Sequence, residues 1–118
     1  MQIKQINMQS LFITIQSLKK NEELNVTTKY KLLKLESFII KEEETINQLI
    51  AELGEKYGEK EEGGRIKIKD EYIEKVQEQL DLLNNQDITL PDIYFNLDEF
   101  ERINISWKDL ENIYCFIK

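Results

Sequence analysis

Apolar residues recur every three to four positions through the middle of the chain, the spacing of one face of an α-helix. From Thr27 or Thr28 onward the sequence has no glycine or proline until Gly54. The apolar seam of this segment keeps a 3-4-3-4 rhythm that only Glu42 interrupts. Its members are Leu32, Leu35, Ile39, Ile46, Leu49 and Leu53. The pattern predicts a long helix whose seam packs against another helix.

A second seam of the same type follows after a turn. Its members are Ile73, Val76, Leu80 and Leu83. Asp70 stands where this helix would be capped, and Asn84 and Asn85, which tolerate the left-handed conformation, mark its end. Two matching seams joined by a turn predict an antiparallel helical hairpin. We expect Ile46 and Leu49 to pack against the seam of the shorter helix.

Two shorter helices are predicted at the ends of the chain. Asn7 is the expected cap of the first, with Ile6 and Leu11 at the positions of a hydrophobic staple. The predicted inner face of this helix is Met8, Leu11, Phe12, Ile15 and Leu18. Ser106, followed by Asp109 three residues later, is the expected cap of the last helix. The predicted inner face of the last helix is Trp107, Leu110, Ile113, Tyr114 and Ile117.

The segments between these helices have alternating or extended character. We expect short extended pieces at residues 2–6, 65–69, 88–91 and 93–95, and a turn or two of helix at residues 97–102. Gly58, Gly63 and Gly64 enclose an exposed tip. The predicted fold is a single domain over residues 1–118 of the mainly α class. It is a long antiparallel helical hairpin with short N- and C-terminal helices and a few short strands.

Composition restricts the chemistry that this chain can perform. The 118 residues include no histidine and one cysteine, Cys115. The lack of histidine removes most zinc sites, the Ser-His and Cys-His nucleophiles and the commonest general base. The glycines follow no phosphate-binding pattern, and the carboxylate clusters lack the order of a calcium loop. We therefore expect no enzymatic activity, no cofactor and no metal, and we expect Cys115 to be a small buried or half-buried apolar residue.

Neither a membrane nor a secretory route is indicated by the sequence. It contains no apolar run of the roughly 18 residues that span a bilayer, and no signal-peptide pattern. A cytoplasmic protein is the expectation that follows.

Charge is distributed unevenly along the chain. The 16 basic and 23 acidic residues give a net charge of −7. Residues 1–35 carry +4, whereas residues 36–64 carry −6. Because duplex-binding proteins normally show a basic stripe, we expect no direct contact with nucleic acid. Glu42, Glu43 and Glu44 are candidate contacts for a basic protein partner, and the alternative is an ordinary solvated helix face.

Aromatic side chains are concentrated near the C-terminus. They are Tyr94, Phe95, Phe100, Trp107, Tyr114 and Phe116. One interpretation is a small core that closes one end of the hairpin. The other is an exposed anchor patch, because Trp and Tyr are enriched at binding hot spots. In that case Tyr94 and Trp107 are candidate partner-binding residues.

Three segments carry a resemblance to a known family. They are residues 28–35 (TKYKLLKL), residues 49–60 (LIAELGEKYGEK) and residues 103–111 (INISWKDLE). In these segments and in the order of its elements, nearly the whole chain resembles a family of small uncharacterised proteins encoded by tailed phages of low-GC bacteria. The resemblance implies a viral origin. It brings no assigned activity or catalytic motif, so no functional residue is transferred.

Two functions follow from these expectations. The first is a phage protein that binds and inhibits a host defence protein, such as a nucleic-acid-binding nuclease complex, in the host cytoplasm. The alternative is a virion or assembly component, such as a connector or tail-assembly factor, for which a homo-oligomer is possible.

Overall fold

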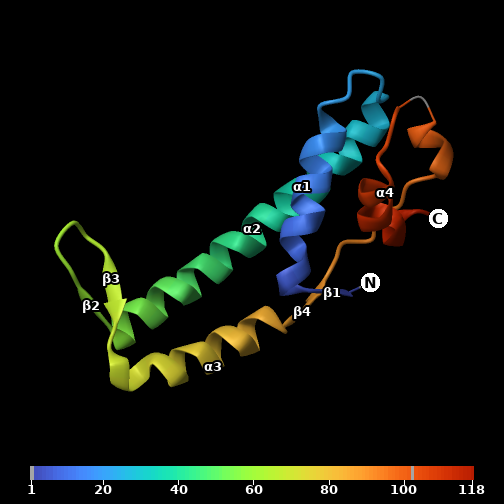
Figure 1. The fold of residues 1–118 in the computed structure, drawn as a ribbon. Helices are drawn as coiled ribbons and strands as arrows, with labels where there is room; N and C mark the ends of the chain where they lie inside the picture. The colour runs from blue at the N-terminus through green and yellow to red at the C-terminus, as the bar shows by residue number, and fades with distance from the viewer. Residues whose placement is uncertain (1, 102) are drawn as a thin grey trace.

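The computed structural model describes residues 2–101 and 103–118. The fold is mainly helical with a few short antiparallel strands, as the sequence predicts (Figure 1). With η marking 3-10 helices, the elements in chain order are β1 (Gln2–Lys4), η1 (Gln5–Asn7), α1 (Met8–Lys19), α2 (Val26–Tyr57), β2 (Gly58–Lys60), β3 (Ile66–Ile68), η2 (Asp70–Tyr72), α3 (Ile73–Asn84), β4 (Asp87–Thr89), η3 (Leu97–Phe100), α4 (Trp107–Ile113) and η4 (Tyr114–Phe116). The predicted helix end at Arg102 lies outside the described residues.

The hydrophobic core lies where α1 and α4 pack beside the N-terminal half of α2. Four of the five residues on the predicted inner face of α1 are buried, and Phe12 is half-buried. The α2 seam contributes Leu32, Leu35 and Ile39, all fully buried, because α1 covers this part of the helix. The C-terminal third closes the core with Leu90, Phe95, Phe100, Ile113 and Phe116. Both ends of the chain therefore build one core.

The helix caps agree only in part with the predictions. Asn25 caps α2, which begins at Val26, and its Oδ1 accepts a hydrogen bond of 2.8 Å from the backbone N–H of Thr28. Ser106 caps α4 as predicted, with its hydroxyl oxygen accepting from the N–H of Asp109 at 3.1 Å. Asn7 precedes α1, but its side chain makes no capping hydrogen bond, and Ile6 is exposed rather than part of a staple.

The first strand of the chain pairs with the strand that follows α3. β1 pairs antiparallel with β4, with Ile3 opposite Ile88, and the predicted strands at both positions are confirmed. The N–H of Gln5 donates to the carbonyl of Gln86 at 2.9 Å, and Lys4 forms an ion pair of 2.7 Å with Asp87. These contacts fix the point where the chain comes back from the hairpin.

The tip of the hairpin is a two-stranded ribbon. β2 pairs antiparallel with β3, which confirms the predicted strand in residues 65–69, and residues 61–67 are exposed. Gly63 and Gly64 have φ values of +87° and +82°, a left-handed conformation that suits glycine and reverses the chain.

The start and end of α3 differ from the prediction. Asp70 begins the short helix η2, so Tyr72 rather than Asp70 is at the N-cap of α3. Asn85 follows α3 with φ of −93°, so the helix does not end in a left-handed residue. Tyr72 instead packs on Tyr57, with 5.1 Å between the ring centroids, and this contact joins η2 to the end of α2.

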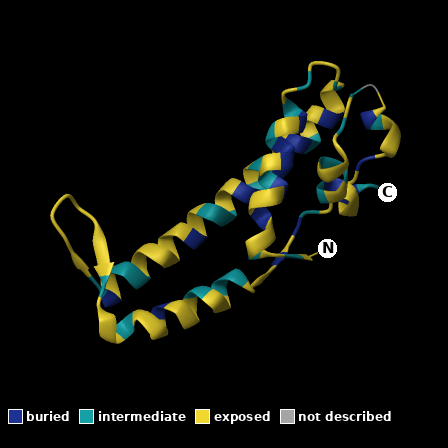
Figure 2. Cartoon of the chain, in the orientation of Figure 1, coloured by how far each residue is buried: buried dark blue, intermediate teal, exposed yellow. Residues whose placement is uncertain are grey.

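We call residues 42–86 the arm and the rest of the chain the body. The arm comprises the C-terminal half of α2, the β2–β3 ribbon and α3, and it extends away from the body in Figure 1. At its root, Ile46 and Leu83 still contact the core. The radius of gyration is 18.1 Å, against about 13.5 Å for a compact domain of this length. Figure 2 shows that buried residues are concentrated in the body.

Candidate functional site

The net charge of the molecule resides in the arm. Residues 42–86 hold thirteen acidic and six basic side chains, which gives −7, whereas the body holds ten of each sign. Glu42, Glu43 and Glu44, the acidic residues singled out from the sequence, lie at the start of the arm in the middle of α2. Glu44 is exposed, and Glu42 and Glu43 are half-buried. The arm is therefore an acidic projection from a neutral body.

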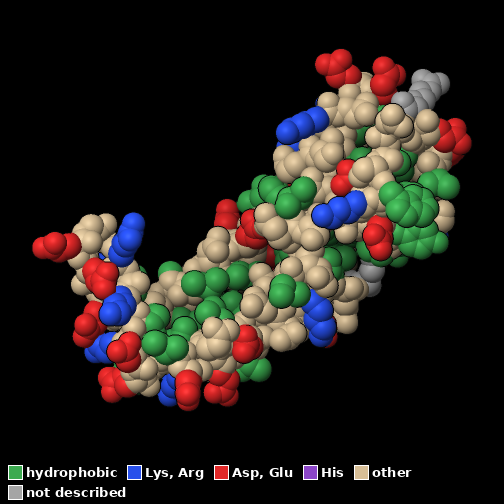
Figure 3. All heavy atoms as spheres, viewed as in Figure 1, with side chains coloured by type: hydrophobic (Ala, Val, Ile, Leu, Met, Phe, Trp, Pro, Cys, Tyr) green, Lys and Arg blue, Asp and Glu red, His purple; other side chains and the backbone are tan. Residues whose placement is uncertain are grey.

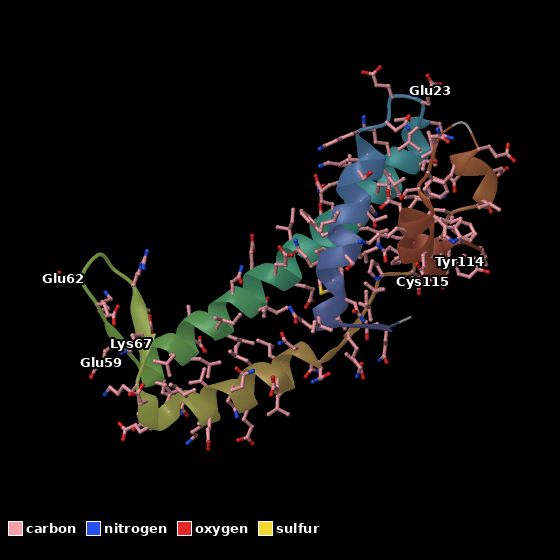
Figure 4. All side chains as sticks on the ribbon, in the orientation of Figure 1. Glu23, Glu59, Glu62, Lys67, Tyr114 and Cys115 are labelled. Carbon is pink, nitrogen blue, oxygen red and sulfur yellow. The ribbon has the colours of Figure 1, made fainter. Side chains whose placement is uncertain are left out.

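Charges at the tip of the arm are mixed. Figure 4 shows Glu59, Glu62 and Lys67 on the β2–β3 ribbon, at the opposite end of the molecule from Tyr114 and Cys115. Lys69 lies 3.6 Å from Glu59, and both side chains are solvated. In the part of the chain that the structure describes, His, Cys, Asp and Glu form no group of three or more able to hold a metal ion.

The hairpin seam loses its cover along the arm. Ile46 is buried, but Leu49 is 43% exposed, so the predicted packing of Leu49 against α3 is incomplete. On α3 only Val76 is buried, and Ile73 is exposed. The two helices are held together at the tip by the strand ribbon and the tyrosine pair, and at the root by Ile46 and Leu83, which both contact the core. Between these points they leave an open groove.

The groove has an apolar lining. Leu49 and Leu53 of α2 and Leu82 and Leu83 of α3 line a hollow of about 360 Å³, with Glu52, Lys56, Gln79 and Gln86 as its polar lining. Figure 3 shows hydrophobic side chains gathered between the two helices of the arm. Leu82 lies outside the predicted α3 seam and was not among the residues singled out from the sequence. Its position next to Leu83, on the otherwise polar side of the helix, was the available signal.

The aromatic residues of the C-terminal third divide between core and surface. Phe95, Phe100 and Phe116 are buried, and the rings of Phe95 and Phe100 lie 5.4 Å apart. Trp107 is 84% exposed and Tyr114 is also exposed, so their predicted place on the inner face of the last helix is wrong. Trp107 is the first residue of α4, and Tyr114 lies beyond its end, in η4.

The exposed aromatic residues do not form one surface with the acidic ones. Trp107 and Tyr114, with Leu110, line a shallow hollow on α4 of about 310 Å³. Tyr94 is partly exposed, and the Lys118 ammonium lies 5.0 Å from its ring centroid. Glu42, Glu43 and Glu44 belong to α2. The structure therefore separates the candidate residues into an acidic set on the arm and an aromatic set on the body.

Cys115 is exposed, which corrects the expectation of a buried or half-buried residue. Partial desolvation of the sulfur raises the pKa of the thiol above its ordinary value. The thiolate is the nucleophilic form, so this environment opposes nucleophilic use of the residue.

The carboxylates with a shifted pKa belong to ion pairs that hold the body together. The pKa of Glu36 is lowered, first by its hydrogen bond from Lys19 and also by one from Gln16. Burial alone would raise the pKa of Glu99. Hydrogen bonds from the Asn96 N–H and from the Lys31 and Thr28 side chains outweigh that effect, so its pKa is also lowered.

The lowered pKa values of these two carboxylates are explained by ion pairs that join elements of the fold. Glu36 ties α2 to α1, and Glu99 ties η3 to α2. Neither carboxylate is among the residues that line the groove between α2 and α3.

Comparisons of the chain with protein-family models, with curated proteins and with solved structures gave no match. In the described part of the chain, none of the helices combines the length and the apolar character needed to cross a bilayer.

Proposed function

We propose that this protein is a phage-encoded, non-enzymatic binding module that docks its acidic arm on a basic host protein. The observation that carries the proposal is the location of the whole net charge of −7 on residues 42–86, beside a neutral body. A projecting surface of one sign steers association with a partner of the opposite sign and raises the association rate.

The charge of the arm favours a partner with a nucleic-acid-binding surface. Such surfaces are rich in Lys and Arg, because they neutralise phosphates. An acidic arm on that surface would compete with nucleic acid, which is how the protein would inhibit a defence nuclease in the host cytoplasm. This part of the proposal draws on the resemblance to phage proteins for the identity of the host.

Reversal of the charges on the arm tests the proposal. The immobilised protein is exposed to host lysate, the retained proteins are identified by mass spectrometry, and the association rate of the purified partner is measured at several salt concentrations. The test variant carries Glu42→Lys, Glu43→Lys and Glu44→Lys. The matched control carries Glu22→Lys, Glu23→Lys and Glu111→Lys, three exposed positions on the body.

We expect a basic, nucleic-acid-binding partner whose association slows as salt increases and slows at least tenfold in the arm variant. The body variant should retain binding within about twofold. Equal loss in both variants, or a partner that is not basic, would contradict the proposal.

A second candidate function is favoured by the exposed Trp107. Trp107 is 84% exposed beside the exposed Tyr114, and Trp and Tyr are the residue types enriched at binding hot spots. If the protein is a virion or assembly component, it should be present in purified particles in stoichiometric amounts. Its incorporation should then depend on Trp107 and Tyr94 rather than on the glutamates. Its absence from particles would eliminate this candidate.

A further inference from the structure

Apolar side chains that face the groove of the arm are partly exposed to solvent. Leu49 and Leu82 face each other across the groove with 43% and 62% of their surface exposed, whereas the α2 seam in the body is fully buried. The difference arises because α1 covers α2 in the body, with α4 packed on α1, whereas only α3 and the β2–β3 ribbon accompany α2 in the arm. The groove is where a further helix would complete the packing.

The surface area of the molecule leaves room for such an occupant. The accessible surface is 8574 Å², whereas a compact domain of this mass exposes about 6,700 Å². An ordinary protein–protein interface covers about 800 Å² on each partner. The excess is large enough for one partner helix to bind along the arm without contact with the body.

The charges around the groove define the chemistry of the occupant. On the outer side of α3, Glu74, Glu78 and Asp81 lie beside Leu82 in a second hollow of about 540 Å³ that has no basic residue in its lining. The groove itself holds one charge of each sign, Glu52 and Lys56, so a helix seated on Leu49 and Leu82 would meet its row of carboxylates along α3. A second copy of the arm would bring the same negative charge to this row, which disfavours symmetric pairing of two arms.

We infer that the groove between α2 and α3 binds an amphipathic helix of the partner, with leucine-like residues on one face and Lys or Arg along its flanks. The binding mode is an apolar helix face laid into an apolar groove, with flanking charges that set orientation and selectivity. This inference rests on the proposed function, and it identifies the part of the basic partner that the arm recognises.

A model peptide tests the inference directly. The probe is a labelled 18-residue helical peptide of Leu and Lys with leucine at every third or fourth position. The control peptide has the same leucines and Glu in place of Lys. Binding to the full-length protein is measured by fluorescence anisotropy. The test variants are Leu82→Gln and Leu49→Gln.

Each test variant has a control of matched exposure. The exposed fraction of Leu97 on η3 is 59%, similar to the 62% of Leu82. The exposed fraction of Leu33 on α2 is 43%, the same as that of Leu49. We expect at least a tenfold weaker affinity for the Leu82→Gln and Leu49→Gln proteins, and less than a twofold change for Leu97→Gln and Leu33→Gln. The peptide with Glu should bind the unmodified protein at least tenfold more weakly than the peptide with Lys.

Other outcomes overturn the inference in distinguishable ways. Equal binding of the two peptides would show that charge plays no role, and unchanged binding by the Leu82→Gln protein would show that the peptide does not bind in the groove.

If sedimentation velocity shows a dimer that Leu82→Gln dissociates, a second copy is the occupant. If the arm glutamates are needed for the host partner but Leu82 is not, the inference fails and the proposed function stands. If the peptide binds in the groove but no basic host partner exists, the proposed function fails alone.

Discussion

Lys31 on α2 forms an ion pair with Glu99 on η3, with 3.1 Å between Nζ and Oε1. The same carboxylate receives the backbone N–H of Asn96 at 2.7 Å and lies 2.9 Å from the hydroxyl of the fully buried Thr28. One side chain from the C-terminal third thus satisfies donors on both the long helix and its own turn. It joins the C-terminal third to the first turns of α2, where the Lys31 ammonium also lies 5.4 Å from the centroid of the Phe95 ring.

Loss of the Glu99 carboxylate should destabilise the body. We expect Glu99→Gln to lower the free energy of unfolding by about 1–3 kcal/mol at pH 7, because a hydrogen-bonded and mostly buried charge pair is broken. Chemical denaturation measures the change. Asp98→Asn, at the exposed neighbouring position, is the control and should change the free energy of unfolding by less than about 0.5 kcal/mol.

The same carboxylates predict a dependence on pH. The pKa values of Glu36 and Glu99 are lowered in the folded state, so the unfolded chain binds protons more readily. Their contribution to stability is complete well above the unfolded pKa of about 4.3 and is lost as the pH falls through the lowered folded pKa. Denaturation curves between pH 7 and pH 3 should show this loss. The loss should be smaller in a Glu36→Gln, Glu99→Gln protein, and an identical loss would contradict the assignment.

Two apolar positions of one seam should differ in their effect on stability. Ile39 is fully buried, so Ile39→Ala should lower the free energy of unfolding by about 2–5 kcal/mol. Leu49 is half-exposed in the open groove, so Leu49→Ala should lower it by about 1 kcal/mol or less. Urea denaturation of the two variants tests the difference. A loss above about 2 kcal/mol for Leu49→Ala would show that α3 closes on α2 in solution.

The sequence pattern predicted the helices but not the degree of closure of the hairpin. The 3-4 spacing identifies which face of α2 is apolar, and Leu32, Leu35 and Ile39 are buried as that pattern requires. Spacing contains no information on how many helices cover each part of the face. For this reason the pattern predicts the same packing for Leu49 as for Ile46, although only the short α3 and the ribbon accompany that stretch.

The C-terminal errors have a different origin. Helical spacing places Trp107 and Tyr114 on the inner face, because large apolar residues at that spacing normally mark a core. The expectation for Cys115 follows instead from the small apolar character of its side chain. The short helix α4 has seven residues, and Ile113 is its one fully buried side chain. The acidic character of the arm could be read from the sequence, whereas Leu82 across from Leu49 required the three-dimensional arrangement.

Two glycines at the end of α2 should respond in opposite ways to alanine. A Cβ at Gly54 would meet only Ile66, at 3.6 Å, so Gly54→Ala should raise the free energy of unfolding by about 0.5–1 kcal/mol through helix propensity. A Cβ at Gly58 would lie 2.5 Å from the carbonyl oxygen of Gly54, so Gly58→Ala should lower it by about 1–3 kcal/mol. Thermal denaturation tests both. A stabilising Gly58→Ala would contradict the close approach of β2 to α2.

The two candidate cap residues form a further matched pair. Ser106→Ala should lower the free energy of unfolding by about 1 kcal/mol, since its hydroxyl accepts the N–H of Asp109. Asn7→Ala should change it by less than about 0.5 kcal/mol, because the Asn7 side chain makes no capping hydrogen bond. Urea denaturation distinguishes the two, and equal losses would show that Asn7 also caps its helix.

The position of the arm between two halves of one core links it to the folding of the whole chain. The core residues of α1 and α2 precede the arm, and those of β4, η3 and α4 follow it. An unstructured segment of 45 residues in place of the arm would impose a closure entropy whose length-dependent part is about 3 kcal/mol. A formed hairpin removes much of that penalty by returning the chain to β1. Mutations that melt the arm at positions other than Ile46 and Leu83 should therefore slow refolding of the body, even though they touch none of its core side chains.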